Sequence, residues 1–160
     1  MNLRVGNGFD IHKFEEGREL WLGGILIENH TGLAGHSDAD VLIHAIIDAL
    51  LGASCIGDIG ELFPDTDKAF KNIRSTLLLE KVVSELCLRG WQIVNVDSTV
   101  ICETPKISQY KLEIRETLAK IMQIPVDCVM VKGKTAEKTG ALGRKEGIAA
   151  IATALLEKQS

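Results

Sequence analysis

The chain has 160 residues, a formal net charge of −4 at pH 7 and 46% hydrophobic residues. This length fits one domain, since a chain of about 150 residues already buries roughly 68–70% of its unfolded surface. The acidic balance argues against the dense basic surface that nucleic acid binding needs, and no apolar run approaches the about 20 residues of a membrane span. We therefore expect no nucleic acid or membrane partner.

The cysteines are widely spaced, form no C-x-x-C pair and stand in apolar stretches: Cys55, Cys87, Cys102 and Cys128. Small buried thiols are the usual occupants of such positions. The N-terminus shows no signal-peptide pattern. Together these features predict a protein of the reducing cytoplasm.

Strands and helices are predicted to intermingle along the chain. Apolar, β-prone stretches at 2–9 and 19–28 predict strands around a polar loop, and further strands are expected over Trp91 to Cys102 and Val126 to Lys132. Helical periodicity appears at roughly 39–53, 74–89, 108–122 and 147–158. Ser37, Ser75 and Ser108 stand near helix starts and Gly90 just past one end. We expect one α/β (α+β-like) domain, residues 1–160, with a mixed sheet that helices cover on one face.

In the strand predicted from Trp91 to Cys102, neither side has the polar pattern of a solvent-exposed face. One side carries Val94, Val96 and Val100. The other mixes apolar and polar residues: Trp91, Ile93, Asn95, Asp97, Thr99 and Ile101. One face is expected to pack on helices and the other to meet a second copy, which predicts a homo-oligomer.

Three possible metal ligands come from two segments. Asp10 and His12 stand two residues apart, and residues i and i+2 of a strand point to the same side. His44, in His36-Ser-Asp-Ala-Asp-Val-Leu-Ile-His44, could supply the third ligand. Two imidazoles and a carboxylate suit zinc or a similar ion, and three protein ligands leave a fourth position for substrate.

The segment from Asp38 onward predicts an amphipathic helix. Its apolar stripe comprises Leu42, Ile43, Ile46, Ile47, Leu50 and Leu51. Asp40, His44 and Asp48 recur every fourth residue on another face, so we expect Asp40 or Asp48 to orient the His44 ring.

The start of this helix suggests two further roles. Ser37 followed by Asp40 predicts a capping box in which Ser37 caps the helix. His36 would stand at the positive end of the helix, where N–H groups can receive a phosphate oxygen, or it is an ordinary exposed loop histidine.

Two other segments are ambiguous by composition. The basic residues Lys132, Lys134, Lys138, Arg144 and Lys145 alternate with Gly133, Gly140, Gly143 and Gly147. They form either a solvated charged loop or an anion cradle. Within it, Glu137 either neutralises lysines or offers a ligand for Mg²⁺. The segment 57–67 is rich in carboxylates and turn formers and predicts a structured loop.

Read together, these segments resemble the 2-C-methyl-D-erythritol 2,4-cyclodiphosphate synthase family of the non-mevalonate isoprenoid pathway. The motifs fall in order across nearly the whole chain: Gly6-Asn-Gly-Phe-Asp-Ile-His12, Gly35-His-Ser-Asp-Ala-Asp40 with His44, Gly57-Asp-Ile-Gly60, Phe63-Pro-Asp-Thr-Asp67, Asn95-Val-Asp97, Pro105-Lys106, Thr135-Ala-Glu-Lys138 and Gly143-Arg-Lys-Glu-Gly147.

The resemblance implies an activity and a metal arrangement. Family members cyclise 4-diphosphocytidyl-2-C-methyl-D-erythritol 2-phosphate with release of CMP, as homotrimers with active sites between subunits. It implies that Asp10, His12 and His44 hold Zn²⁺ (or Mn²⁺). A second ion, Mg²⁺ (or Mn²⁺), would bind the diphosphate with help from Glu137. His36 and Thr135 would stabilise the transition state.

The resemblance also implies substrate contacts. The methylerythritol and sugar portions would meet Asp58, Ile59, Gly60, Phe63, Pro64, Asp65, Thr66 and Asp67. The cytosine would meet Cys102, Glu103, Thr104, Pro105, Lys106, Ile107 and Ser108. The phosphates would meet Lys134, Thr135, Ala136 and Glu137. The substrate-binding set is completed by Asp10, His12, His36, Ser37, Ala141 and Arg144, although the family commonly has an aromatic residue where this chain has Ala141.

Two rival interpretations use the same residues. A zinc-dependent phosphohydrolase would use the open metal position to activate water. A metal-stabilised trimeric binding protein would bind nucleotide without any chemistry. The mass of the product distinguishes the three, because only cyclisation keeps both phosphates in a ring and releases CMP.

Overall fold

The computed structural model describes residues 2–64 and 66–159. Among them, five strands form one mixed sheet in the order β2-β1-β5-β3-β4, in which only the β3–β4 pair is parallel. The strands are β1 (Leu3–Leu22), β2 (Ile25–Leu33), β3 (Trp91–Ile101), β4 (Val129–Lys134) and β5 (Gly147–Lys158). This confirms the predicted single α/β domain with a mixed sheet.

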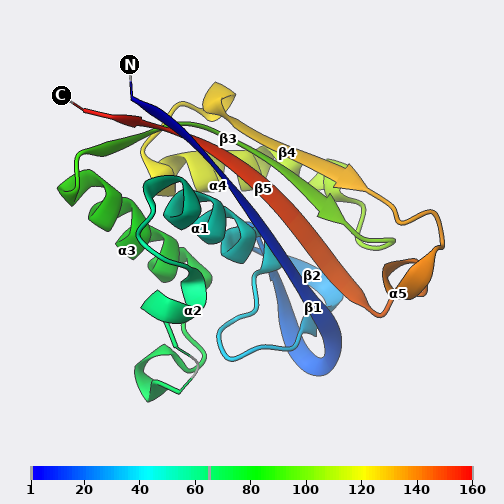
Figure 1. Cartoon of the computed structure of the whole chain (residues 1–160). Coiled ribbons are helices and arrows are strands. Elements are labelled where there is room, and N and C mark those ends of the chain that lie inside the picture. The colour runs from blue at the N-terminus through cyan, green and yellow to red at the C-terminus, as the bar shows by residue number, and fades with distance from the viewer. Residues whose placement is uncertain (1, 65, 160) are drawn as a thin grey trace.

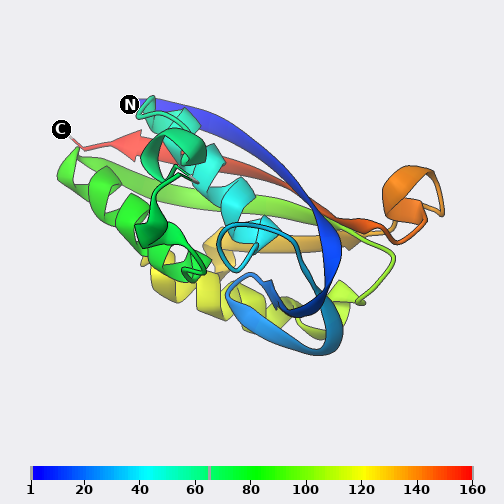
Figure 2. The ribbon, with the colours of Figure 1, turned by 90° about the horizontal axis from the view of Figure 1, so that it is seen from below.

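Three long helices cover one face of the sheet (Figures 1 and 2). They are α1 (Val41–Ser54), α3 (Ser75–Leu88) and α4 (Lys111–Met122). Two single-turn helices, α2 (Ile59–Leu62) and α5 (Gly140–Gly143), lie in the connections. Short 3₁₀ turns are η1 (Lys68–Phe70), η2 (Ile107–Gln109) and η3 (Val126–Cys128). The described residues include no helix long and apolar enough to cross a membrane.

The three predicted helices at 39–53, 74–89 and 108–122 are confirmed. The third begins later than expected, because Ser108 lies in the 3₁₀ turn η2 and the α-helix starts at Lys111. Ser75 is the first residue of α3, and Gly90 follows that helix with φ of 72°. A positive φ at this position is the usual way for a helix to end at glycine.

The predicted helix at 147–158 is wrong, since these residues form the central strand β5. Alanine favours helices locally, and the run Gly-Ile-Ala-Ala-Ile-Ala-Thr-Ala has several. In the fold, alternate residues of β5 are buried against the helices: Ile148, Ala150, Ala152, Ala154 and Leu156. Small side chains there let α1 pack close to a strand that has neighbours on both edges, so tertiary packing overrides the local preference.

The predicted polar loop between 2–9 and 19–28 is also wrong. β1 runs without a break from Leu3 to Leu22, pairing first with β5 and then with β2. The chain reverses later, at Gly23 and Gly24, where φ is 61° and 85°. The polar residues lie near the point where the pairing of β1 with β5 ends, at Lys13, and the pairing with β2 begins, at Phe14. Register shifts on either side of Glu19 mark the irregular part of the strand.

The residues on the buried side of β3 differ from those that the alternation of the sequence predicted. A register shift between Ile93 and Asn95 brings Trp91, Ile93 and Val96 to the buried side, while Val94 stays 36% exposed. A bulge adds one residue and exchanges the faces on either side of it, which simple alternation cannot anticipate.

The four cysteines are free thiols. Cys102 is buried and Cys128 half-buried, but Cys55 and Cys87 are exposed. The expectation of burial is therefore wrong for two of them. Cys87 lies in the last turn of α3 and Cys55 directly follows α1.

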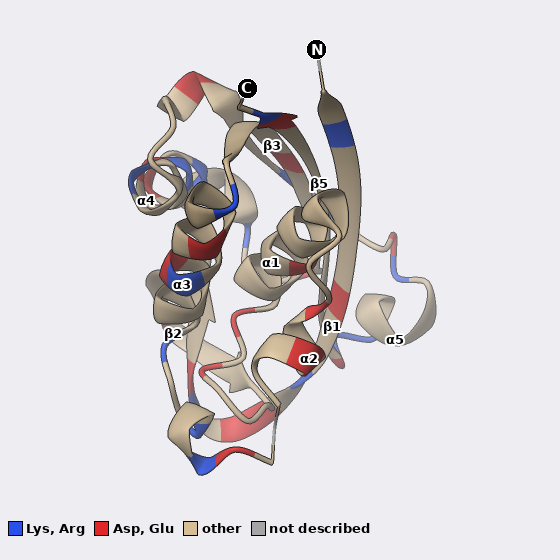
Figure 3. Ribbon diagram, turned by 60° about the vertical axis from the view of Figure 1, so that its left-hand side comes forward, with Lys and Arg blue, Asp and Glu red and all other residues tan. Residues whose placement is uncertain are grey.

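Two glycines of β1 let the strand touch the backbone of α1, which packs against β1 and β5 (Figure 3). A Cβ on Gly6 would stand 1.9 Å from the carbonyl oxygen of Ala49, and one on Gly8 would stand 1.9 Å from that of Ala45. No side chain fits at such distances. Glycine at both positions therefore sets the spacing between the strand that carries Asp10 and the helix that carries His44.

We expect Gly8→Ala to lower the free energy of unfolding by at least about 2 kcal/mol, because the added methyl group forces β1 away from α1. Chemical denaturation measures this. The matched control is Gly52→Ala on α1 itself, where the nearest atom to a new Cβ is 4.0 Å away. It should be neutral or stabilising by up to about 1 kcal/mol. Equal stability of the two variants would contradict the packing argument.

Candidate active site

Asp10, His12 and His44 meet between β1 and α1. The Asp10 Oδ2 atom lies 2.9 Å from His12 Nε2 and 3.0 Å from His44 Nδ1, and the two ring nitrogens are 3.3 Å apart. All three residues are half-buried and offer their ligand atoms to a common point. The three residues fit a divalent metal ion, as their spacing in the sequence predicted.

The ionisation state of Asp10 suits metal binding. Burial alone would raise the pKa of Asp10, but hydrogen bonds and charge from His12 and His44 outweigh it and hold that pKa well below its usual range. Burial would lower the pKa of His12, whereas the hydrogen bond to Asp10 and its charge raise that pKa above its ordinary value. Asp10 is therefore an ionised ligand at neutral pH.

The far side of the His44 ring contacts two serines. Its Nε2 atom lies 2.9 Å from Ser75 Oγ and 3.1 Å from Ser37 Oγ. The expectation that Asp40 or Asp48 orients this ring is wrong. Both carboxylates instead accept backbone N–H groups, Asp48 from Ile59 at 2.9 Å.

Asp40, not Ser37, caps α1. Its carboxylate is fully buried and accepts hydrogen bonds from the N–H groups of Ile43, Gly23 and Gly24 at 3.0, 2.9 and 2.7 Å. Asp40 stands directly before the first helical residue, as an N-cap must, whereas Ser37 is three residues too early. His36 thus lies in the loop before α1 and not at its free N-terminus.

A pocket of about 250 Å³ opens over the three ligands. Of the predicted substrate contacts, its wall includes His36, Ser37, Ile59, Gly60 and Phe63. Asp58 caps the adjoining helix α2, accepting from Glu61 N at 2.8 Å. Pro64, Thr66 and Asp67 continue the loop beyond Phe63, and Asp65 lies outside the described residues.

A second pocket, of about 600 Å³, lies where β3 and β4 end. It brings together most of the predicted cytosine and phosphate contacts: Cys102, Glu103, Pro105, Lys106, Ile107, Ser108, Lys134 and Thr135. Thr104 faces a neighbouring hollow with Lys13 and Lys145. Ala141 lies in α5, and Arg144, which follows it, pairs with Glu146 at 2.6 Å.

The phosphate segment, residues 134–137 with the adjoining Lys138, makes contacts that the sequence did not reveal. The Glu103 carboxylate accepts from the N–H groups of Ala136 and Lys138 at 3.0 and 3.2 Å. Thr135 Oγ1 donates to the Glu137 carboxylate. Two backbone amides of the basic stretch therefore already hold a carboxylate of the same chain, and they are not the glycine amides that the anion-cradle interpretation named.

The two pockets of one chain lie apart. Along the sheet, Ile11 pairs with Ala149, Ala149 with Ile101, and Ile101 with Lys134. Three strand spacings separate the metal ligands from the phosphate segment, roughly 14 Å. Accordingly, the metal-binding group found among the described residues contains Asp10, His12 and His44 but not Glu137.

A profile of the YgbB family matches residues 3–157. This chain belongs to the YgbB family. Among curated relatives, the 2-C-methyl-D-erythritol 2,4-cyclodiphosphate synthase of Bacteroides fragilis is 51% identical over 158 residues, covering 99% of each chain. The protein of the same name from Phocaeicola vulgatus is 54% identical with the same coverage.

The fold of this chain is also similar to that of solved IspDF and IspF structures. The bifunctional IspDF of Campylobacter jejuni matches 99% of this YgbB-family chain with a TM-score of 0.95 and 40% identity. The present chain spans 43% of that larger protein. The CDP complex of Plasmodium falciparum IspF matches with a TM-score of 0.86 and 36% identity, covering 99% of this chain and 98% of the other.

The sequence did not single out Asp38 and Arg74 near this YgbB-family site, and it noted Ser75 only as a helix start. Ser75 contacts the His44 ring, Asp38 contacts Ser75, and Arg74 pairs with Asp38 at 2.9 Å. Asp38 lies within the motif around His36, but Ser75 lies 31 residues from His44. No local spacing rule links two such distant positions.

We expect His44→Ala to weaken zinc binding by more than about 100-fold, since even loss of a residue that only supports a ligand costs 10–100-fold. Competition with a coloured chelator measures the affinity. His30→Ala removes a half-buried histidine outside the cluster and should bind one equivalent as the unaltered protein does. Full zinc binding by His44→Ala would remove the assignment.

Proposed function

We propose that this protein converts 4-diphosphocytidyl-2-C-methyl-D-erythritol 2-phosphate to 2-C-methyl-D-erythritol 2,4-cyclodiphosphate and CMP, in the non-mevalonate isoprenoid precursor pathway. It is thus a cyclising phosphorus–oxygen lyase. The observation that carries this proposal is the convergence of Asp10, His12 and His44 beneath a pocket, in a chain about half identical to synthases of that name.

The chemistry needs no protein nucleophile. An oxygen of the substrate's own 2-phosphate attacks the β-phosphorus, and the bond from that phosphorus to the oxygen of the CMP portion breaks. Phosphoryl transfer of this kind depends on positioning and charge stabilisation. Holding both phosphate ends together makes the attack intramolecular, which can lower the barrier by about 7–11 kcal/mol relative to a bimolecular encounter.

Divalent metal suits both parts of the site. We assign Zn²⁺ or Mn²⁺ to Asp10, His12 and His44, and Mg²⁺ or Mn²⁺ at the substrate diphosphate to Glu137. When bound, such ions offset the negative charge of the phosphates. We assign the stabilisation of the transition state to His36, in the wall of the first pocket, and to Thr135, in that of the second.

We assign the two pockets to the two ends of the substrate. The first, with Ser37, would receive the methylerythritol portion, through residues Asp58, Ile59, Gly60 and Phe63 to Asp67. The second would receive the nucleotide, with the cytosine against Cys102 to Ser108 and the phosphates against Lys134 to Glu137, Ala141 and Arg144. CDP is the ligand named for relatives from this family, which supports a cytidine nucleotide.

We further propose a homotrimer in which neighbouring subunits complete each active site. The sheet face opposite the helices exposes apolar side chains: Val5 68%, Phe9 55%, Ile11 50%, Met130 38% and Ile151 39%. Such a patch is unusual for a monomer. The separation of the two pockets within one chain supports the same arrangement, because one substrate must reach both.

We place the enzyme in the cytoplasm, without nucleic acid as a partner. Four free thiols, two of them exposed, suit a reducing compartment. The net charge of −4 supports a small-molecule substrate held by local cations over a polyanionic partner.

Incubation with the diphosphocytidyl substrate, Mg²⁺ and Zn²⁺ should yield CMP and a cyclic diphosphate of the corresponding mass. Asp10→Ala should reduce product formation at least about 1000-fold while leaving the oligomer intact, because a metal-ligand charge is lost at the reacting phosphates. The exposed Asp127→Ala is the matched control and should turn over normally. A linear hydrolysed product would favour the phosphohydrolase, and nucleotide binding without CMP release would favour a binding protein.

The assembly is tested by Ile151→Lys, which places a charge in the exposed apolar face of the sheet. It should dissociate the trimer and abolish turnover while each subunit still binds zinc, as measured by sedimentation and chelator competition. Leu88→Lys changes an equally apolar residue that is 83% exposed at the end of α3 and should remain trimeric. A monomeric but fully active Ile151→Lys would contradict a shared site.

A further inference from the structure

We infer that Asp38 and Ser75 position His44 as a metal ligand by fixing which of its ring nitrogens carries the proton. This inference rests on the proposed metal site and concerns residues outside the ligand set. A neutral imidazole has one nitrogen that donates and one that accepts, and only the accepting nitrogen can bind a metal. The partner of the second nitrogen therefore decides which one faces the ion.

Ser75 links the His44 ring to a carboxylate. Its side chain is fully buried at the start of α3, and its Oγ atom lies 2.9 Å from His44 Nε2. On its other side the same hydroxyl donates to Asp38 Oδ1. The chain of contacts runs from Asp38 through Ser75 to His44, whose Nδ1 atom is the one that faces Asp10.

The direction of these hydrogen bonds follows from the surroundings of Asp38. Its carboxylate accepts from Arg74 Nε at 2.9 Å, from Ser75 N at 3.0 Å and from Asp40 N at 3.2 Å. Each of these partners is a donor, so the carboxylate acts as their acceptor. The single hydroxyl hydrogen of Ser75 is thus committed to Asp38, and Ser75 offers only lone pairs to His44. When the ring is neutral and binds metal, its one proton therefore stays on Nε2, and Nδ1 would offer its lone pair to the ion in place of the hydrogen bond to Asp10.

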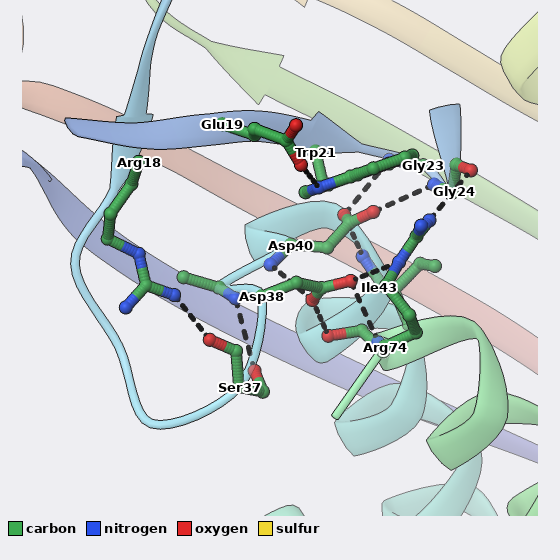
Figure 4. A network of polar contacts seen from close by, with 12 residues as sticks. Arg18, Glu19, Trp21, Gly23, Gly24, Ser37, Asp38, Asp40, Ile43 and Arg74 are labelled. Atoms are coloured by element: carbon green, nitrogen blue, oxygen red, sulfur yellow. Dashed lines mark hydrogen bonds and ion pairs between the residues drawn. The ribbon is translucent and has the colours of Figure 1, made fainter. Parts of the chain in front are cut away.

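Asp38 is itself held in place. Figure 4 shows its carboxylate and the Arg74 side chain pointing toward one another, with Asp40 turned toward Gly23 and Gly24. The Arg74 guanidinium lies 3.2 Å from the centre of the Trp21 ring and within 3.4 Å of the Gly24 carbonyl oxygen. A carboxylate with these partners cannot turn away from Ser75 without breaking several contacts at once.

Ser37 cannot replace Ser75 in this role. Its Oγ lies 3.1 Å from the same His44 nitrogen and accepts from Ala39 N at 3.1 Å, and it makes no hydrogen bond to a carboxylate of residues 2–64 or 66–159. Its hydroxyl hydrogen is not committed, so it can donate or accept as the pocket requires. The two serines thus differ in function although both touch one ring atom.

The test compares Ser75→Ala with Ser54→Ala in the full-length protein. Ser54 is also a buried helical serine, but its hydroxyl donates only to carbonyl groups of its own helix. We expect Ser75→Ala to weaken zinc binding by 10–100-fold in chelator competition. In the zinc-loaded protein, the slowly exchanging Nε2 proton of His44, seen by histidine-selective NMR, should lose its protection. Ser54→Ala should match the unaltered protein in both measurements.

Unchanged zinc affinity and an unchanged His44 Nε2 proton signal in folded Ser75→Ala would overturn the inference while leaving the proposed metal site standing. If instead His44→Ala binds zinc as well as the unaltered protein, the metal site itself is wrong. Circular dichroism establishes folding, and if Ser75→Ala does not fold, Ser75→Cys is judged by the same two measurements. It keeps a similar volume but supplies a much weaker hydrogen-bonding group.

Discussion

The approach of β1 to α1 at Gly6 and Gly8 is the constraint on which the site depends. Backbone meets backbone there, with no side chain between them. The next two inward-facing positions of the same strand are Asp10 and His12, and His44 lies on the facing helix. A methyl group at either glycine would displace one ligand-bearing element relative to the other. Metal ligands tolerate only a few tenths of an ångström of error, so tight packing becomes a requirement of function.

Behind the ligands, buried polar groups hold the loop between β2 and α1. Asp40 accepts three backbone N–H groups, two of them from the Gly23–Gly24 turn, and Asp38 ties the same loop to the start of α3. Buried carboxylates are costly unless their hydrogen-bonding capacity is satisfied, and here it is satisfied by groups from three separate segments. The loop carrying His36 and Ser37 is consequently fixed by α1, α3 and the hairpin turn together.

Local patterns predicted what depends on local geometry. The two-residue spacing of Asp10 and His12 and the helical stripe around His44 were sufficient to find the metal ligands, and three helices were placed correctly. The predictions were wrong where the structure of a segment depends on packing against residues far away in the sequence. The alanines of β5 favour a helix until α1 and two neighbouring strands enclose them. Likewise, the bulge at Val94 and the contact of Ser75 with His44 join residues whose proximity exists only in the folded chain.

The pairing of β1 with β5 joins the two ends of the chain, with Leu3 opposite Glu157, Asp10 opposite Ala150 and His12 opposite Ile148. Contacts of such long sequence separation form slowly, because the loop between them must close first. During synthesis, the strand that carries Asp10 and His12 has no β5 partner until Gly147–Lys158 has left the ribosome. Chains that lack residues 147–158 are thus left without the pairing that holds Asp10 and His12 in line with each other.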